Sequence, residues 1–235
     1  MLDTVLTRIF APTGAVGFAL VAEAHASGLF NAVTLPAWIE LVLALFLLDL
    51  AIYLQHRLFI TCPSSGDCTG CNMPADLDVD VTTGVRFHPG EILLSLGIKL
   101  IVILSLGTPA SAVLLFEIGL NATSMFNHSN VRIPSAVERL VRWFVVTPDM
   151  HRVHHSVVPR ETDSNFGFNF PWWDRLFGTY RSQPEAGHQA MTLGIGNFRD
   201  PKELRLHRML MQPFRDDPGQ SEPVEKAANS STKAS

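Results

Sequence analysis

Apolar residues gather into a few long blocks along this chain, and these blocks predict membrane helices. The block over 35–54 contains Glu40 and Asp49 as its charged residues and is long enough to cross a bilayer. A weaker candidate covers 14–30, where a glutamate and a histidine interrupt the apolar run. The pattern therefore makes 35–54 the strongest candidate span.

A third apolar block predicts a helical hairpin. It covers 92–106 with Lys99 as its charged residue, and the apolar run resumes over 110–120. Gly-Thr-Pro at 107–109 is typical of a sharp turn, so we expect the chain to enter the membrane here and return, with re-entrant or short-helix geometry as the variant form.

The second half of the chain has the pattern of a polar cap. The segment 137–146 is amphipathic at helical spacing and predicts a helix lying at the membrane interface. The segment 165–180 is rich in aromatic residues, which favour the headgroup level. From about residue 213 the composition predicts a disordered tail.

Composition agrees with a membrane protein of one main domain. Of 235 residues, 47% are hydrophobic and 17% charged, and the net charge of −4 gives no reason to expect a nucleic-acid partner. The three cysteines are too few for a disulfide scaffold. No cleavable signal peptide is recognisable, so we expect the first apolar stretch to be retained.

Loop charges predict an orientation. The connections 31–34 and 107–112 carry no Lys or Arg, and the positive-inside rule places the other set of loops in the cytoplasm. That set contains Arg57, Arg86, Arg132, Arg139, Arg142 and Arg152. The same parity puts the following histidines on the cytoplasmic side: His56, His88, His128 and the group at 151–155.

Three histidines within 151–155 are the strongest sign of chemistry. On a helix His151 and His155 project from one face with His154 beside them, so the three rings can reach one point. A set of imidazoles with little thiolate suits iron, zinc, copper or nickel and argues against an iron–sulfur cluster. The alternative is a solvated polar turn between membrane segments.

Other candidate residues carry rival structural interpretations. Asp49, Tyr53 and His56 share one helix face, where Asp49 could orient a ligand histidine or could pair with Lys99 or an arginine. His128 follows the hairpin and is a ligand candidate or a helix cap, and His88 is a weaker candidate in a loop. The remaining histidines are expected to be structural or exposed: His25, His188 and His207.

The motifs, taken in order, resemble the fatty acid hydroxylase/sterol desaturase superfamily over about residues 35–182. They are Asp49-x3-Tyr53-x2-His56-Arg57, Asp80-Val81-Thr82-Thr83-x2-Arg86-Phe87-His88-Pro89, Phe126-x-His128-Ser129-Asn130, His151-x2-His154-His155, Asn165-Phe166-Gly167 and Trp173-Asp174-Arg175-Leu176-Phe177-Gly178-Thr179-Tyr180.

This resemblance implies an all-α integral membrane bundle of about four membrane helices with a cytoplasmic, histidine-rich helical cap. It also implies three regions: an N-terminal membrane segment (1–34), the hydroxylase-like domain (35–182) and a C-terminal extension (183–235). The implied iron ligands are His56, His128, His151, His154 and His155. His88, Asp49, Tyr53 and Asp174 are possible ligands or supporting residues.

By the same resemblance, two irons would activate dioxygen to hydroxylate or desaturate a C–H bond of a lipid that enters from the bilayer. No ordinary side chain can perform this step, so a metal cofactor is required. The electrons would come from a partner such as a cytochrome b5 or a ferredoxin. Lipid substrate and regiochemistry stay open at this level.

The family pattern breaks at 60–74, where a second histidine block is expected. The chain instead has a small, polar segment with Cys62, Cys68 and Cys71. One hypothesis is a frame-shifted translation, because a neighbouring reading frame of suitable codons encodes histidines. The alternatives are a zinc site formed by these cysteines with His56, or an unliganded loop. A non-catalytic or damaged family member and a zinc-dependent membrane hydrolase therefore stay open as functions.

Overall fold

The computed structural model shows helices joined by turns and loops in the part of the chain that it describes. That part comprises residues 10–61, 79–81, 83, 89–194, 208 and 211. It contains no β-strand, and Ser156 and Leu193 form an isolated antiparallel bridge. The all-α prediction is confirmed for these residues.

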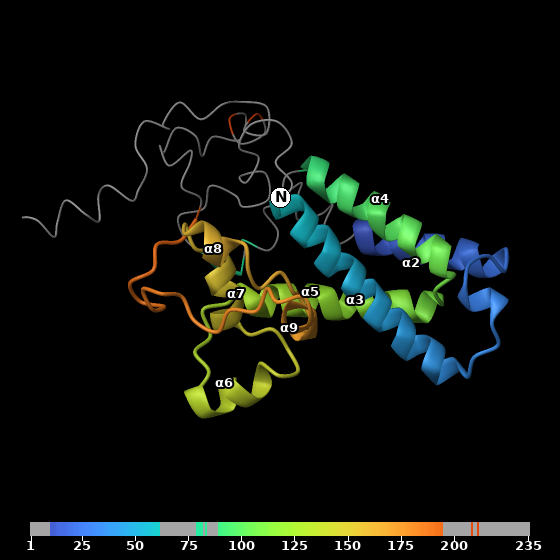
Figure 1. Ribbon diagram of the computed structural model, residues 1–235. Coiled ribbons are helices and arrows are strands. Elements are labelled where there is room, and N and C mark those ends of the chain that lie inside the picture. Colours follow the sequence, from blue (N-terminus) through green and yellow to red (C-terminus); the bar gives the residue numbers. More distant parts are fainter. Residues whose placement is uncertain are drawn as a thin grey trace, which may run out of the picture.

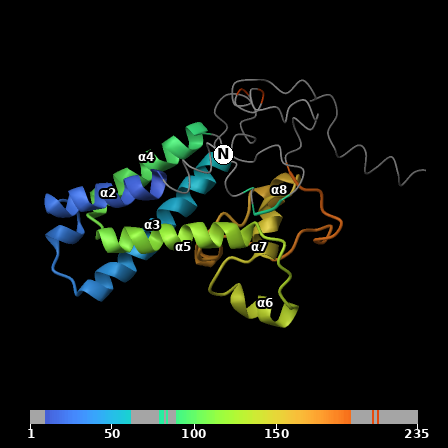
Figure 2. The same ribbon diagram turned by 180° about the vertical axis from the view of Figure 1, so that it is seen from behind.

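Four long helices form an elongated bundle (Figures 1 and 2). They are α2 (Ala11–Ala24), α3 (Ala37–Thr61), α4 (Pro89–Leu106) and α5 (Ala110–Asn127), with a short 3-10 helix, η2 (Phe30–Ala32), between the first two. Both α2 and α3 pack against α4 and α5. Their shared core is apolar, built from Ala15, Ala19, Leu48, Ile52, Ile103, Val113 and Phe116.

The predicted hairpin is present as α4 and α5. Gly107 adopts a positive φ of 66° in the turn and lies against Gly28, where an added Cβ would sit 2.2 Å from the Gly107 nitrogen. Only glycine tolerates both the conformation and the close approach. The Glu23 side chain accepts a hydrogen bond from the first amide of α5, that of Ala110, at 2.7 Å.

One helix of the described part, α3 over 37–60, is long and apolar enough to span a membrane, as the block at 35–54 predicts. A core helix of a soluble protein would be mostly buried, yet 28% of this apolar window is buried. The weaker block at 14–30 overlaps α2, a shorter apolar helix of 14 residues that ends at Ala24. The expected total of about four membrane helices stays a prediction.

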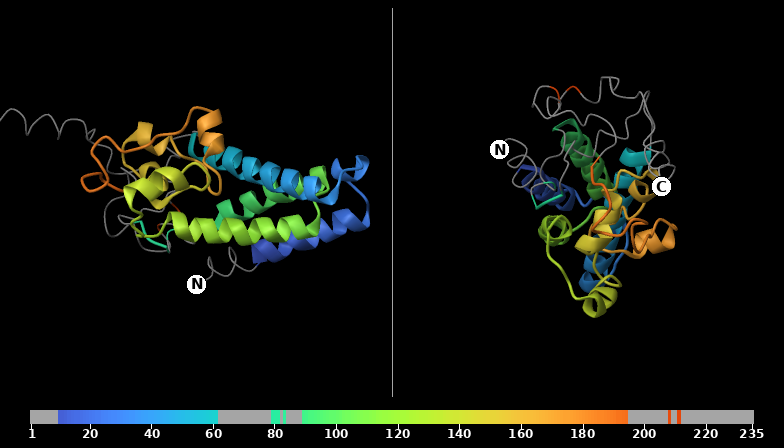
Figure 3. Two further views of the ribbon diagram at one scale, coloured as in Figure 1. Left: turned by 90° about the horizontal axis from the view of Figure 1, so that it is seen from below. Right: turned by 90° about the vertical axis from the view of Figure 1, so that its left-hand side faces the viewer.

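Four short helices form a cap at one end of the bundle (Figure 3). They are α6 (Ser135–Val141), α7 (Pro148–His154), α8 (Pro159–Thr162) and α9 (Trp172–Leu176). Contacts between α5 and α7 join this cap to the bundle. The position of the cap relative to the cytoplasm stays a prediction.

The amphipathic segment 137–146 is helical for less of its length than expected, because α6 ends at Val141. Glu138 and Arg142, on its polar side, are buried against the cap, whereas Leu140 and Phe144 are exposed. The buried ion pair between Glu138 and Arg142 explains why the polar side faces the protein. The outward apolar side is consistent with the predicted place at the interface.

Three parts of the sequence-based interpretation lie outside the described residues. These are the candidate ligand His88, the cysteine-containing segment from residue 62 onward, and the predicted disordered tail from 213.

Candidate metal centre

Three histidine nitrogens converge where the bundle meets the cap. The Nε2 atoms of His128 and His151 are 3.2 Å apart, those of His128 and His155 are 3.2 Å apart, and those of His151 and His155 are 3.3 Å apart. All three residues are buried. An ion at the usual metal–imidazole distance of about 2.0–2.1 Å holds neighbouring nitrogens roughly 3 to 3.4 Å apart. The triangle therefore fits a metal ion.

Local sequence explains how α7 supplies two of these rings. Thr147 caps the helix by accepting a hydrogen bond from the Met150 amide, and Pro148 occupies the first turn, where its missing N–H costs nothing. His151 and His155 follow four residues apart and share a face. His128 terminates α5 and meets them from the bundle.

Hydrogen bonds fix three rings in the form that binds metals. His128 Nδ1 donates to the Ser124 carbonyl at 2.7 Å, His154 Nδ1 to that of Ser164 at 2.9 Å, and His56 Nδ1 to that of Phe166 at 2.8 Å. Each proton on Nδ1 leaves Nε2 with a free lone pair.

No placement of the ring protons satisfies all three contacts of the triangle by hydrogen bonds. In a neutral His128 ring with its proton on Nδ1, Nε2 can only accept, from both His151 and His155. The contact between His151 and His155 would then set two N–H groups against each other. A cation at the centre satisfies all three nitrogens at once.

The cap histidines are neutral at physiological pH. Burial away from water, followed by the nearby His56 ring, lowers the pKa of His154 to about 3. Burial and the neighbouring His128 ring hold the pKa of His151 and of His155 well below the ordinary range. Neutral imidazole is the form that binds metal, so no proton must be removed first.

His154 and His56 form a second group beside the triangle. Their ring centroids are 4.7 Å apart, while the His154 centroid lies 5.6 Å from that of His151. His154 is not a fourth corner of the triangle, because its bond to the Ser164 carbonyl turns the ring toward His56. The structure thus brings five predicted ligands together as a set of three and a set of two.

The loop 165–169 shapes this second group. Asp174 holds the loop by accepting hydrogen bonds from the amides of Phe166 and Gly167 at 2.8 and 3.0 Å. The Phe166 carbonyl, fixed in this way, accepts the Nδ1 proton of His56. Asn165 adopts a positive φ of 52° and its side chain donates to two backbone carbonyls, those of Met150 and Arg181.

Asp174 and Tyr53 thus support the loop 165–169 beside His56. Thr179 links the two, since its hydroxyl donates to Asp174 at 2.7 Å and lies 2.8 Å from the Tyr53 hydroxyl. Burial raises the pKa of Asp174, while its hydrogen bonds oppose that change. Tyr53 also stacks on Phe177, with ring centroids 5.4 Å apart.

Asp49 has a different role from either one expected for it. Its two oxygens accept hydrogen bonds from Asn169 and from the Trp173 indole, both at 2.8 Å. The contacts observed here are neither to a ligand histidine nor to Lys99, which pairs with Glu117 at 2.5 Å. Asp49 thus links α3 to the cap through these two hydrogen bonds.

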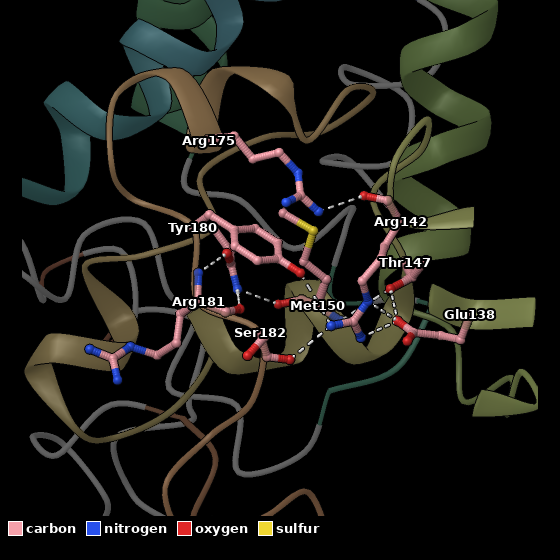
Figure 4. A network of polar contacts seen from close by, with 9 residues as sticks. Glu138, Arg142, Thr147, Met150, Arg175, Tyr180, Arg181 and Ser182 are labelled. Atoms are coloured by element: carbon pink, nitrogen blue, oxygen red, sulfur yellow. Dashed lines mark hydrogen bonds and ion pairs between the residues drawn. The ribbon is translucent and has the colours of Figure 1, made fainter. Parts of the chain in front are cut away.

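A second network of polar contacts includes Thr147, the residue that precedes α7 (Figure 4). The Arg142 guanidinium contacts Glu138, donates to the Ser182 carbonyl at 2.9 Å and reaches the Tyr180 hydroxyl at 3.3 Å. Glu138 also accepts from Thr147, the residue that caps α7. This network fixes the start of the helix that carries His151 and His155.

Sequence inspection missed a polar lining next to His56. Glu91, Ser95 and Lys99 recur at helical spacing on α4, as do Glu117, Asn121 and Ser124 on α5, and all of them line one cavity. The missed signal is the spacing of polar residues within otherwise apolar blocks. Of the other histidines, His25 is exposed and His188 is partly buried, while His207 lies outside the described residues.

Part of the chain matches a known protein family. Residues 75–179 match the family described as fatty acid hydroxylase. The matched segment is a little under half of the chain. The superfamily resemblance drawn from the motifs is thereby confirmed, and the match includes His128 and the three histidines of the cap.

Two relatives bear names from the same superfamily. The ornithine lipid hydroxylase OlsE of Rhizobium tropici is 28% identical over 149 residues, which are 63% of this chain and 44% of that protein. The alkylglycerol monooxygenase of Xenopus tropicalis is 32% identical over 71 residues, 30% of this chain and 16% of that protein. The chain thus spans less than half the length of these relatives. No solved structure matches it.

Proposed function

We propose that this protein is a membrane-bound, iron-dependent lipid hydroxylase. The carrying observation is the buried triangle of Nε2 atoms from His128, His151 and His155. Hydroxylation is favoured over desaturation because the two relatives are named a hydroxylase and a monooxygenase. Iron bound at this centre supplies the activation of dioxygen toward an unactivated C–H bond, which no side chain can provide.

The chain's own residues bind, orient and exclude water. The triangle would hold one iron, while His56 and His154 form a pair beside it that would need further ligands to hold a second. Phe166 and Phe168 pack against these rings, with centroids 5.8 and 4.9 Å from that of His56, and keep water from the centre. Electrons would come from a partner such as a cytochrome b5 or a ferredoxin, and the lipid would enter from the bilayer.

The proposal is tested by oxidation of membrane lipids. Membranes containing the protein, supplied with oxygen and a reductant, should produce lipids that carry one added oxygen atom, and His151→Ala should abolish them. A second sample carries the 60–74 segment re-encoded in the neighbouring reading frame. If that segment is a frame-shift, this sample should show the higher activity. Failure of both samples to oxidise lipid contradicts the proposal.

A zinc-dependent hydrolase is the second candidate, because three histidine nitrogens with one open position also suit catalytic zinc. It would release free fatty acid from membrane lipids without oxygen or reductant. The same membranes, assayed without oxygen, distinguish it from the hydroxylase. A non-catalytic family member would show neither reaction.

A further inference from the structure

A cavity of about 140 Å³ begins beside His56 and lies between α3, α4 and α5. Ser124 and Phe168 line it near the histidines, while Lys99 and Glu117 line it farther along the bundle. Glu117 precedes His128 by 11 residues, or about 16 Å of helix. The cavity thus runs from the metal centre toward the middle of the bundle.

One polar atom in the wall of this cavity has no partner within the described chain. Gln55 is 9% exposed, and its Nε2 donates to the Ser95 hydroxyl at 2.7 Å. Its carbonyl oxygen, Oε1, is buried without a hydrogen-bond donor in the described residues. A buried amide oxygen is costly to leave unpaired, so this position is suited to a donor brought by a ligand.

The charges in the wall determine what kind of donor fits. The charged residues in the wall are Lys99, Glu117 and Glu91. Lys99 and Glu117 are 7% and 3% exposed and bond to each other at 2.5 Å, so this pair is already neutralised. Glu91 is only partly buried and already has an interaction of its own. An ionised ligand group would bring a further charge into a buried site without a matching partner, which is strongly unfavourable. The donor should therefore be uncharged.

We propose that this cavity recognises an uncharged hydrogen-bond donor of the lipid, a hydroxyl or a secondary amide, which donates to Gln55 Oε1. This inference rests on the proposed lipid substrate and adds its polar group. Because Gln55 immediately precedes His56, a donor bound there would hold the adjoining carbon atoms beside the metal centre. Gln55 is then a specificity-determining residue, and a purely hydrocarbon chain would bind less well.

Binding measured without turnover tests this proposal. The full chain in detergent micelles is titrated with two pairs of probes, and tryptophan fluorescence reports the dissociation constants. N-methyldodecanamide is compared with N,N-dimethyldodecanamide, and dodecan-1-ol with 1-methoxydodecane, because the second member of each pair lacks the donor. We expect the donor to improve binding about 3- to 10-fold in at least one pair, as for one neutral hydrogen bond.

Variants assign that preference to Gln55. Gln55→Met keeps the side-chain volume and should abolish the preference, whereas Gln183→Leu, at an exposed position away from the cavity, should retain it. Comparison of each variant with the original protein cancels the unequal partition of the probes into micelles. Equal binding of both members of both pairs by the original protein overturns the proposal, even if Gln55→Met fails to fold. So does a preference that survives Gln55→Met.

The outcome is separable from that of the proposed function. These measurements need neither metal nor oxygen, so a donor preference without lipid oxidation would leave the subsite standing and count against the hydroxylase. Lipid oxidation without a donor preference would support the hydroxylase and overturn the subsite at Gln55.

Discussion

Asp174 stabilises the centre by accepting three hydrogen bonds, from the amides of Phe166 and Gly167 and from the Thr179 hydroxyl. In Asp174→Asn an N–H group replaces one acceptor and faces a donor. We expect the free energy of unfolding to fall by about 1–3 kcal/mol, measured by chemical denaturation in micelles.

Asp163→Asn is the matched control, because Asp163 is exposed. Its effect should stay within about 0.5 kcal/mol. Equal stability of the two variants would show that Asp174 does not hold the loop.

A substitution at Gly167 tests the close packing of the same loop. An added Cβ would lie 2.8 Å from Asp174 Oδ2 and 2.8 Å from the Phe170 carbonyl oxygen. Gly167→Ala should therefore cost about 1–3 kcal/mol of stability. Gly119→Ala places its Cβ where nothing lies within 4 Å, on a helix that favours alanine, and should not destabilise. A neutral Gly167→Ala would contradict the crowding described here.

The shared face of His151 and His155 could be predicted from their spacing, since four residues make about one helical turn. The partner of His154 could not, because it is the carbonyl of Ser164, set by the loop that follows α7. The role of Asp49 escaped prediction for a similar reason. Its partners, Asn169 and Trp173, lie 120 and 124 residues away in sequence.

At the level of elements, the buried ion pair between Glu138 and Arg142 should stabilise the cap more than any other single contact. Arg142→Met leaves Glu138 buried without its cation, and we expect a loss of about 3–5 kcal/mol of stability. Arg160→Met breaks the exposed pair with Glu185, whose side chains are 63% and 51% exposed, and should cost at most about 1 kcal/mol. Thermal unfolding of both variants measures the difference.

Similar losses for both variants would mean that the buried network does not hold α7 in place. A large loss confined to Arg142→Met, accompanied by weaker metal binding, is the expected result, because Thr147 joins Glu138 to the cap of α7.

The long elements were largely predictable. Apolar length predicted α3, and Gly-Thr-Pro predicted the turn between α4 and α5. The extent of α6 was not, because its end depends on contacts of Arg142 with Tyr180 and Ser182, far along the chain. The cavity between α3, α4 and α5 was missed because each polar residue in it, read singly, interrupts an apolar block.

In the whole molecule, the bundle presents apolar side chains outward and the histidines gather at its capped end. Exposed residues such as Trp38, Leu93, Ile101 and Ile118 are typical of a surface in contact with lipid. Loop charges predicted that the histidines share one side of the membrane, and five of them do meet. Whether that side is the cytoplasm stays a prediction that chain topology alone does not test.

The most direct test is the metal content of the purified full chain, measured by mass spectrometry after expression in iron-supplemented medium. We predict about one iron per chain, because only the triangle of His128, His151 and His155 is complete among the described residues. His128→Ala should lose this iron, and His25→Ala, at an exposed histidine, should keep it. Protein that binds no iron, or a His128→Ala variant that binds as much as the original, would contradict the account.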